Sequence, residues 1–279
     1  MRSRLTRVLF VLSVLAPTAA MAAPKNTEAK KGSPGACGAK ILPLAVGNSW
    51  TYVSVPAPAA AAGDVIRITP NNPKSFVITV KSIDDQGGDT VVTLEERLTY
   101  ELKDRKKPTE ERIVKSTITC SGNGKKFDVS PDSFLFAGEP GGYHGITISK
   151  LERKGTSLQL VGGTIGEAKW QEDLLVTWTE APSQGVTAKL GSGTLELERV
   201  FQPAEPESVS TKQGTYLAEK IAVTTTGRVR LDSPRSQTFK QQDLPPNWTN
   251  QLWLAEGVGV VQTLNAFAHM YQLSEVTLK

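Results

Sequence analysis

The residues with the most chemical potential in this chain are its two histidines and its two cysteines. A nucleophilic hydrolase needs a serine or cysteine beside a histidine that has a carboxylate behind it. His144 lies in a glycine-rich segment and His269 lies near the final residues, and the sequence has no Gly-x-Ser-x-Gly turn to present a nucleophile. We therefore interpret both histidines as structural and predict no catalytic residue, so that a hydrolase is the least favoured function.

Metal and cofactor sites are not predicted either. The acids of Asp84–Asp89 could supply oxygen ligands to calcium, but their spacing is not that of the helix-loop-helix calcium loop, and a solvated hairpin turn fits them better. Gly162–Gly166 and Gly257–Gly259 are glycine-rich but lack the full dinucleotide-binding and phosphate-loop patterns. Acids are plentiful, and no pair of them is singled out as the carboxylates of a glycosidase.

The first residues have the pattern of a secretory signal peptide. Arg2, Arg4 and Arg7 form a positive region, Val8–Ala16 is a short apolar run, and Ala20-Met21-Ala22 is a small-x-small cleavage sequence. We expect residues 1–22 to be a leader that is cut after Ala22. The apolar run is too short for a membrane anchor, which needs about 20 residues, and no later segment is apolar enough to span as a helix. The mature chain is therefore expected to be exported without a transmembrane segment.

The charge of the chain is concentrated before its body. The 279 residues have a formal net charge of +4, yet residues 41–279 carry 25 Lys and Arg against 27 Asp and Glu, a net charge of −2. The excess lies in the leader and in residues 23–40, which we interpret as a flexible basic linker. A nucleic-acid partner is therefore not expected.

Export changes the interpretation of Cys37 and Cys120, because paired cysteines are stable in oxidising compartments. We predict that they form a disulfide between the linker and a strand. The alternatives are two free buried thiols or half of a metal site, and the latter lacks a nearby histidine or third cysteine.

Hydrophobic residues recur with a period of two. In residues 90–102 the even positions are apolar except for Glu96, and the odd positions are polar, as in a strand with one buried face. Similar alternation over residues 76–80, 114–120 and 195–201 predicts antiparallel strands. In residues 217–223, Leu217 is predicted to share the buried face with Ile221 and Val223.

The expected fold class is all-β, either a strongly curved antiparallel sheet (a half-open barrel) or a β-sandwich, with at most one or two short helices. Residues 167–174 are the best helix candidate. Residues 41–279 are expected to form one large β domain, with a subdivision near 138–145 or 202–206 as the alternative.

Three stretches together resemble a group of uncharacterised exported proteins of Gram-negative bacteria, frequent in myxobacteria, with the patterns PL-x-x-GN-x-W-x-Y, V-x-V-PAGT-[FY] and W-x-APGVG-[LV]-V. The stretches are Leu42–Tyr52 (LPLAVGNSWTY), Val209–Tyr216 (VSTKQGTY) and Trp253–Val261 (WLAEGVGVV). Lys212-Gln213 and Glu256 depart from these patterns. The resemblance implies the half-barrel architecture of periplasmic lipoprotein carriers (LolA-like), with a small helical plug, and a periplasmic or secreted location. It implies no catalytic residue.

The function expected from these patterns is non-enzymatic binding of an apolar or lipid-like small molecule on the concave face of the sheet. The alternative is a structural or assembly protein of the cell envelope that docks another envelope protein. No cofactor is expected. Four aromatic residues are predicted to line a ligand cavity or to fill the core: Trp50, Tyr52, Trp178 and Trp253.

Overall fold

The structure is a computed structural model that describes residues 35–58, 72–102, 108–121, 124–131, 133–137, 146–180, 192–232, 247–265 and 269–279. The expected leader with its cleavage site at Ala22, most of the expected linker, the segment 138–145 and His144 lie outside these ranges. No helix in the described ranges is long and apolar enough to cross a membrane.

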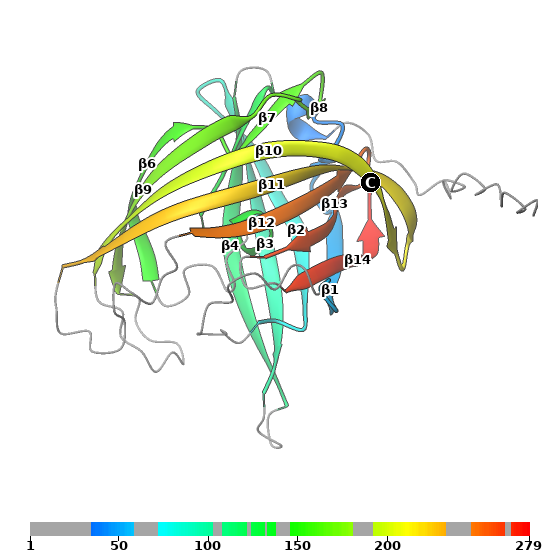
Figure 1. Ribbon diagram of the computed structural model, residues 1–279, viewed down its shortest axis with the longest axis horizontal. Coiled ribbons are helices and arrows are strands. Elements are labelled where there is room, and N and C mark those ends of the chain that lie inside the picture. Colours follow the sequence, from blue (N-terminus) through cyan, green and yellow to red (C-terminus); the bar gives the residue numbers. More distant parts are fainter. Residues whose placement is uncertain are drawn as a thin grey trace, which may run out of the picture.

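The described strands form one antiparallel sheet, which confirms the all-β prediction (Figure 1). In chain order they are β1 (Ser49–Val55), β2 (Ser75–Gln86), β3 (Asp89–Glu101), β4 (Thr109–Ser121), β5 (Lys126–Val129), β6 (Ile146–Gly155), β7 (Leu158–Val161), β8 (Thr164–Ile165), β9 (Trp170–Glu180), β10 (Gly193–Thr211), β11 (Gly214–Leu231), β12 (Asn247–Ala255), β13 (Gly259–Leu264) and β14 (Met270–Thr277). The helical elements of the same ranges are the short 3-10 turn η1 (Ala36–Gly38) and the helix α1 (Phe134–Ala137).

The order of the strands in the sheet is β6-β9-β10-β11-β12-β13-β14-β1-β2-β3-β4-β5-β7-β8. The long strands β10 and β11 arch across the molecule, and β2, β3 and β4 cross beneath them (Figure 1). The sheet is strongly curved but not closed, because β6 and β8, the strands at its two ends, do not pair with each other among the described residues.

Alternation of polar and apolar residues produces the buried face. In β3 the side chains of Val92, Leu94, Glu96, Leu98 and Tyr100 are buried, and the residues that alternate with them are partly or fully exposed. Successive side chains of a strand point to opposite faces, so the apolar set covers the concave side. The turn at the Asp84–Asp89 acids is a tight hairpin of β2 and β3, as the sequence predicts.

The helix expected at residues 167–174 is wrong, because residues 170–180 form β9. Trp170, Glu172, Leu174 and Val176 are all buried, which is a period of two rather than 3.6. Glu172 in this segment is fully buried and lies beside basic side chains of the two neighbouring strands.

The expectation that Leu217 shares a buried face with Ile221 is also wrong, because Leu217 is 66% exposed. The register between β10 and β11 shifts between Ala204 and Glu207, where β10 carries an extra residue. An extra residue reverses which side chains face inward, so Tyr216 and Ala218 are buried before the shift and Ile221 after it. The candidate boundary at 202–206 lies within β10 at this irregularity.

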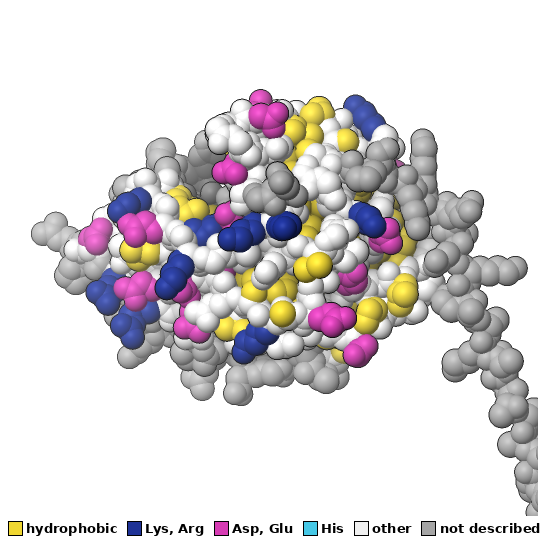
Figure 2. Space-filling view, turned by 90° about the horizontal axis from the view of Figure 1, so that it is seen from above, with side chains coloured by type: hydrophobic (Ala, Val, Ile, Leu, Met, Phe, Trp, Pro, Cys, Tyr) yellow, Lys and Arg dark blue, Asp and Glu magenta, His cyan; other side chains and the backbone are white. Residues whose placement is uncertain are grey.

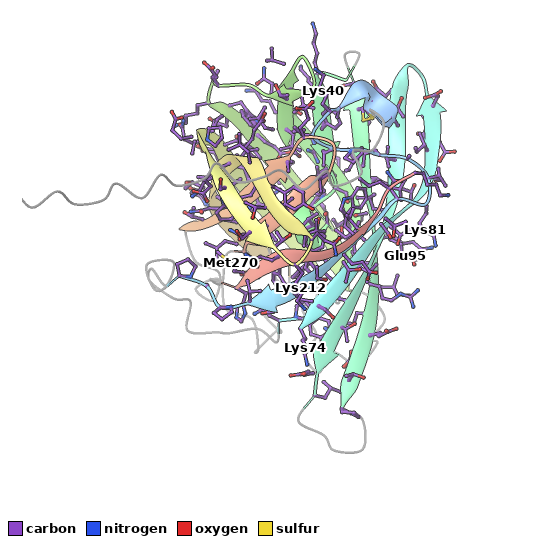
Figure 3. The ribbon with its side chains drawn as sticks, turned by 90° about the vertical axis from the view of Figure 1, so that its right-hand side faces the viewer. Lys40, Lys74, Lys81, Glu95, Lys212 and Met270 are labelled. Carbon is purple, nitrogen blue, oxygen red and sulfur yellow. A yellow bond between two sulfur atoms is a disulfide. The ribbon has the colours of Figure 1, made fainter. Side chains whose placement is uncertain are left out.

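Residues 35–44 are here called the strap. They pack against one end of the curved sheet and contain Cys37 of the predicted disulfide. Cys37 is bonded to Cys120 of β4, with 5.9 Å between the Cα atoms, so that prediction is confirmed. The amide of Lys40 donates to the carbonyl of Gly163 in the β7–β8 turn (3.0 Å), and the amide of Gly257 in the β12–β13 turn donates to the carbonyl of Lys40 (2.7 Å). The strap therefore joins three separated parts of the sheet (Figure 3).

Side chains also hold the two ends of the sheet together. Arg153 of β6 donates to the carbonyl of Val129 in β5 (2.6 Å), and the hydroxyl of Ser157 accepts from the amide of Val129 (3.1 Å). The amide of Ile165 in β8 donates to a carboxylate oxygen of Glu219 in β11 (2.7 Å). Backbone amides and carbonyls near the ends of the sheet thus form hydrogen bonds with side chains.

The disulfide is expected to contribute to stability by restricting the unfolded chain. Replacing Cys37 and Cys120 together by serine should lower the free energy of unfolding by about 4 kcal/mol, because the bond closes a loop of 83 residues. Urea denaturation followed by tryptophan fluorescence measures the change. A reductant should lower the midpoint of the parent protein and leave that of the double variant unchanged; an equal response of both would contradict the expectation.

Candidate functional site

Trp50 and Tyr52 of β1 lie inside the curved sheet and bind the backbone of β13 and the turn before it. The indole nitrogen of Trp50 donates to the carbonyl of Val258 (2.6 Å), and the hydroxyl of Tyr52 donates to the carbonyl of Val260 (2.7 Å). Both side chains are buried. Gly259 between the two acceptors has a φ of 104°, and a Cβ atom there would lie 3.1 Å from the Trp50 nitrogen. The first and last of the three sequence motifs are therefore in direct contact.

The middle motif forms the hairpin of β10 and β11, with Lys212 at its tip (Figure 3). Gln213 in its turn donates through its side chain to the carbonyl of Ser274 in β14 (2.8 Å), which fixes the hairpin against the far side of the sheet. Trp253 of β12 is buried; its indole nitrogen donates to Glu207, and the ammonium of Lys220 lies 4.9 Å from the centre of its ring. Trp253 is thus held by contacts within the fold.

An aromatic cluster fills the centre of the concave face. The ring of Phe76 stacks on Tyr52 with 4.8 Å between centroids and meets Phe134 and Tyr271 edge-on at 4.9 and 5.2 Å. Offset stacking and edge contacts of this kind are the favoured geometries of aromatic pairs. Phe134 comes from α1, so the helix contributes to the cluster.

Residues 133–137, here called the plug, are held by Glu96, the one residue that interrupted the apolar alternation of β3. Its carboxylate is fully buried and accepts from the hydroxyl of Ser116 (2.7 Å) and from the amides of Phe134 (2.9 Å) and Leu135 (3.2 Å). Burial raises the pKa of Glu96, and these hydrogen bonds act in the opposite direction. A polar residue at an inward position thus marks the attachment point of the plug.

A small apolar cavity of about 20 Å³ lies where the sheet, the strap and the plug meet. A second cavity of about 10 Å³ lies between the plug and strands β10, β11 and β12. Each has about the room that one water molecule needs. The residues that line the first cavity are Leu42 and Leu44 of the strap, Leu135 and Phe136 of the plug, and Trp50, Tyr52, Ile78, Leu94, Ile118, Gly259 and Val260 of the sheet.

Sequence reasoning missed a buried network of charges on the same face. Glu172 of β9 is fully buried; it pairs with Arg153 of β6, lies 3.7 Å from a guanidinium nitrogen of Arg199 in β10, and accepts from Ser157 (2.8 Å). Arg153 also lies 3.6 Å from Asp128 of β5. Two cations therefore face two anions. The feature of the sequence that could have indicated this network is that Glu172 and Arg199 occupy inward positions of their strands.

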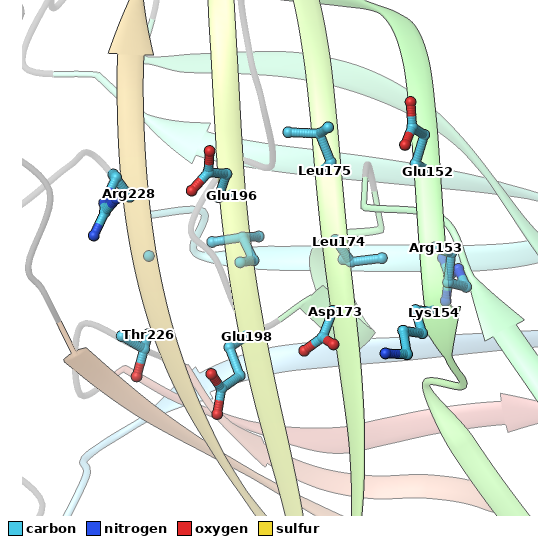
Figure 4. A pocket seen from close by; sticks show the side chains of 12 residues that line it. Glu152, Arg153, Lys154, Asp173, Leu174, Leu175, Glu196, Glu198, Thr226 and Arg228 are labelled. Atoms are coloured by element: carbon cyan, nitrogen blue, oxygen red, sulfur yellow. The ribbon is translucent and has the colours of Figure 1, made fainter.

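A larger hollow lies on the outer face of β6, β9, β10 and β11 (Figure 4). Its volume is about 560 Å³, and three consecutive residues of each of the four strands line it. Those with a charge are Glu152, Arg153, Lys154, Asp173, Glu196, Glu198 and Arg228. The hollow thus carries four acids and three bases, and it is open to solvent.

The remaining sequence candidates form no chemical centre in the part of the chain that the structure describes. His269 is partly buried beside Asn265 in the turn before β14, and burial lowers its pKa. The side chain of Trp178 lies outside the described residues. No group of three or more His, Cys, Asp or Glu side chains within the described ranges could hold a metal ion.

Comparisons with known proteins give no family. No family model and no curated protein matches the chain. A solved structure from Bacteroides fragilis, described as a proposed exported protein with a YmcC-like fold, has a TM-score of 0.47 and 11% identity. A proposed lipoprotein from Parabacteroides distasonis has a TM-score of 0.42 and 13% identity. Each match covers 86% of this chain and 99% of the other. Neither likeness bears on function, and the similarity to lipoprotein carriers stays a prediction.

The Tyr52 hydroxyl is expected to contribute to stability, because it donates a buried hydrogen bond to the carbonyl of Val260. Tyr52→Phe should lower the free energy of unfolding by about 1–2 kcal/mol in chemical denaturation. Tyr216→Phe is the matched control, because the buried Tyr216 hydroxyl has no hydrogen-bond partner and its removal should cost little. Equal losses of unfolding free energy in the two variants would show that the Tyr52 hydrogen bond does not stabilise the fold.

Proposed function

We propose that this protein is an exported, non-enzymatic binding protein of the periplasm that takes an apolar or lipid-like ligand on the concave face of its sheet. Two features support export: the leader pattern of residues 1–22, and the Cys37–Cys120 disulfide, which suits an oxidising compartment. The absence of a catalytic motif in the sequence agrees with a binding role.

The observation that carries the proposal is the way the concave face is covered. Within the described ranges the cover consists of two short elements, the strap and the plug, rather than a second sheet. The strap is held by a disulfide and backbone hydrogen bonds, and the plug by the single carboxylate of Glu96. The 20 Å³ cavity lies at their meeting point. A cover in separate pieces can be displaced without breaking the strand pairing.

Binding in this scheme is an exchange of apolar contacts. Leu135 and Phe136 of the plug occupy the space that a hydrocarbon chain would take, and Trp50 and Tyr52 form the wall behind them. Because the plug lies in place in this structure, the apparent affinity for a ligand depends on the fraction of molecules in which the plug is displaced. Weakening the hold of Glu96 should therefore improve binding.

The test compares two adjacent carboxylates of β3. Glu96 faces inward and holds the plug, and Glu95 faces outward near Lys81 (Figure 3). Glu96→Gln should raise the affinity for the fluorescent apolar probe N-phenyl-1-naphthylamine by about tenfold, since losing about 1.4 kcal/mol of plug attachment has that effect. Glu95→Gln should leave it unchanged. Near-ultraviolet circular dichroism checks that both variants keep their tertiary packing.

The proposal would be wrong if folded Glu96→Gln and Glu95→Gln proteins took up the probe equally. Native mass spectrometry of the parent protein, purified from its own host, gives an independent result: a bound apolar molecule supports the proposal, and a ligand-free protein contradicts it.

A second candidate is an assembly protein that docks another envelope protein on the outer hollow of β6, β9, β10 and β11. The observation that favours it is the packing of the interior, whose described cavities are about 10 and 20 Å³, against 560 Å³ outside. Charged side chains are interspersed with hydrophobic ones on the surface seen in Figure 2. The acidic excess of the hollow fits a partner with a basic surface.

A photo-crosslinking amino acid in place of Leu175, which lies in the hollow, tests this candidate in cells. An adduct with one envelope protein is expected that is weakened when Glu196 and Glu198 are replaced by lysine, because the charge complementarity is then lost. The same crosslinker in place of Val161, which is exposed on β7, is the control. Identical adducts from both positions, or none from position 175, would count against docking at the hollow.

A further inference from the structure

Two buried polar side chains on the concave face have no hydrogen-bond partner. Thr225 of β11 is fully buried and Asn250 of β12 is 1% exposed. The hydroxyl of Thr225 and both the oxygen and the nitrogen of the Asn250 amide are unpaired. A buried polar group without a partner costs folding free energy, and most buried groups in native proteins are paired. Other buried atoms of the described residues also lack a hydrogen-bond partner, among them the Tyr216 hydroxyl, but Thr225 and Asn250 place three such atoms on adjacent strands, and this grouping calls for an explanation.

Strand register places these residues opposite two residues that line a cavity. Thr225 is opposite Arg199 of β10, and Asn250 is opposite Val223 of β11, two residues from Thr225 on the same face. Arg199 and Val223 line the 10 Å³ cavity, and Phe136 of the plug lies on its other side. Thr225 and Asn250 do not line this cavity themselves, but each is the strand partner of a residue that does, and the cavity enlarges if the plug is displaced.

The chemistry of the surroundings selects the kind of group that fits. Arg199 and Arg153 are balanced by Glu172 and Asp128, so the neighbouring charges need no counter-ion. The Asn250 amide offers both a donor and an acceptor, and so does the Thr225 hydroxyl. A group that both donates and accepts without carrying a charge satisfies the two residues together.

We propose that Thr225 and Asn250 bind the hydroxyl head of an uncharged amphipathic ligand, whose hydrocarbon part takes the place of the plug. This inference rests on the proposed binding of an apolar ligand and defines its polar end. The two unpaired side chains then lower the stability of the ligand-free fold, and a ligand with a hydroxyl restores the missing hydrogen bonds when it binds.

The test uses two isomers, octan-1-ol and 1-methoxyheptane, which have the same size but differ in that only the alcohol can donate. Isothermal titration of the full chain should show octan-1-ol binding about tenfold more tightly. Asn250→Leu should bring this ratio close to one while the ether still binds. Thr225→Val should reduce the ratio, and Thr224→Val, on the opposite exposed face of the same strand, should leave it unchanged.

The outcomes separate this inference from the proposed function. Equal binding of the two isomers by the parent protein would overturn the inference and leave apolar binding in place, and the polar atoms would then hold only water. Binding of neither isomer would overturn both. The melting temperature of Asn250→Leu should be unchanged or higher, because leucine removes unpaired polar atoms; a clear fall would show that Asn250 is structural.

Discussion

A sheet that curves without closing leaves an apolar concave face, and the rest of this structure depends on how that face is covered. A closed barrel would satisfy its edges by strand pairing, and a sandwich would supply a second sheet. Here the described cover is the strap of residues 35–44 and the plug of residues 133–137. Because both are short, each needs a strong local attachment, which the Cys37–Cys120 disulfide and the carboxylate of Glu96 provide.

Where strand pairing does not close the sheet, buried polar side chains connect its parts. Glu96 and Glu172 are fully buried, and each accepts hydrogen bonds from, or pairs with, elements distant in sequence. In a low-dielectric interior such contacts are strong when complete and costly when incomplete. Thr225 and Asn250 are the contrast, since their polar atoms are equally buried and have no partners. One carboxylate oxygen of Glu172 also accepts no hydrogen bond, but Glu172 is held by its ion pairs with Arg153 and Arg199.

The first and the last of the three motif stretches are in direct contact in the fold. Trp50 and Tyr52 bind the carbonyls of Val258 and Val260 across 208 residues of sequence, and Gly259 gives the room that the indole needs. Their aromatic character suggested ligand contact, but their polar atoms are already used within the fold. The recognition chemistry that we propose lies instead on β11 and β12, outside the three motifs.

The sequence alone determined the parts that depend on local chemistry. A period of two predicts strands with one buried face, glycines and acids predict the β2–β3 turn, and two cysteines in an exported chain predict the disulfide. Tertiary structure alone decided the rest. Residues 167–174 were the best helix candidate, yet residues 170–180 form β9, in which Glu172 points inward and faces Arg153 and Arg199 of the flanking strands. Leu217 is exposed because an extra residue on the partner strand shifts the register. The partners of an inward polar residue come from distant strands, so a sequence can mark Glu96 as an exception but cannot say what it binds.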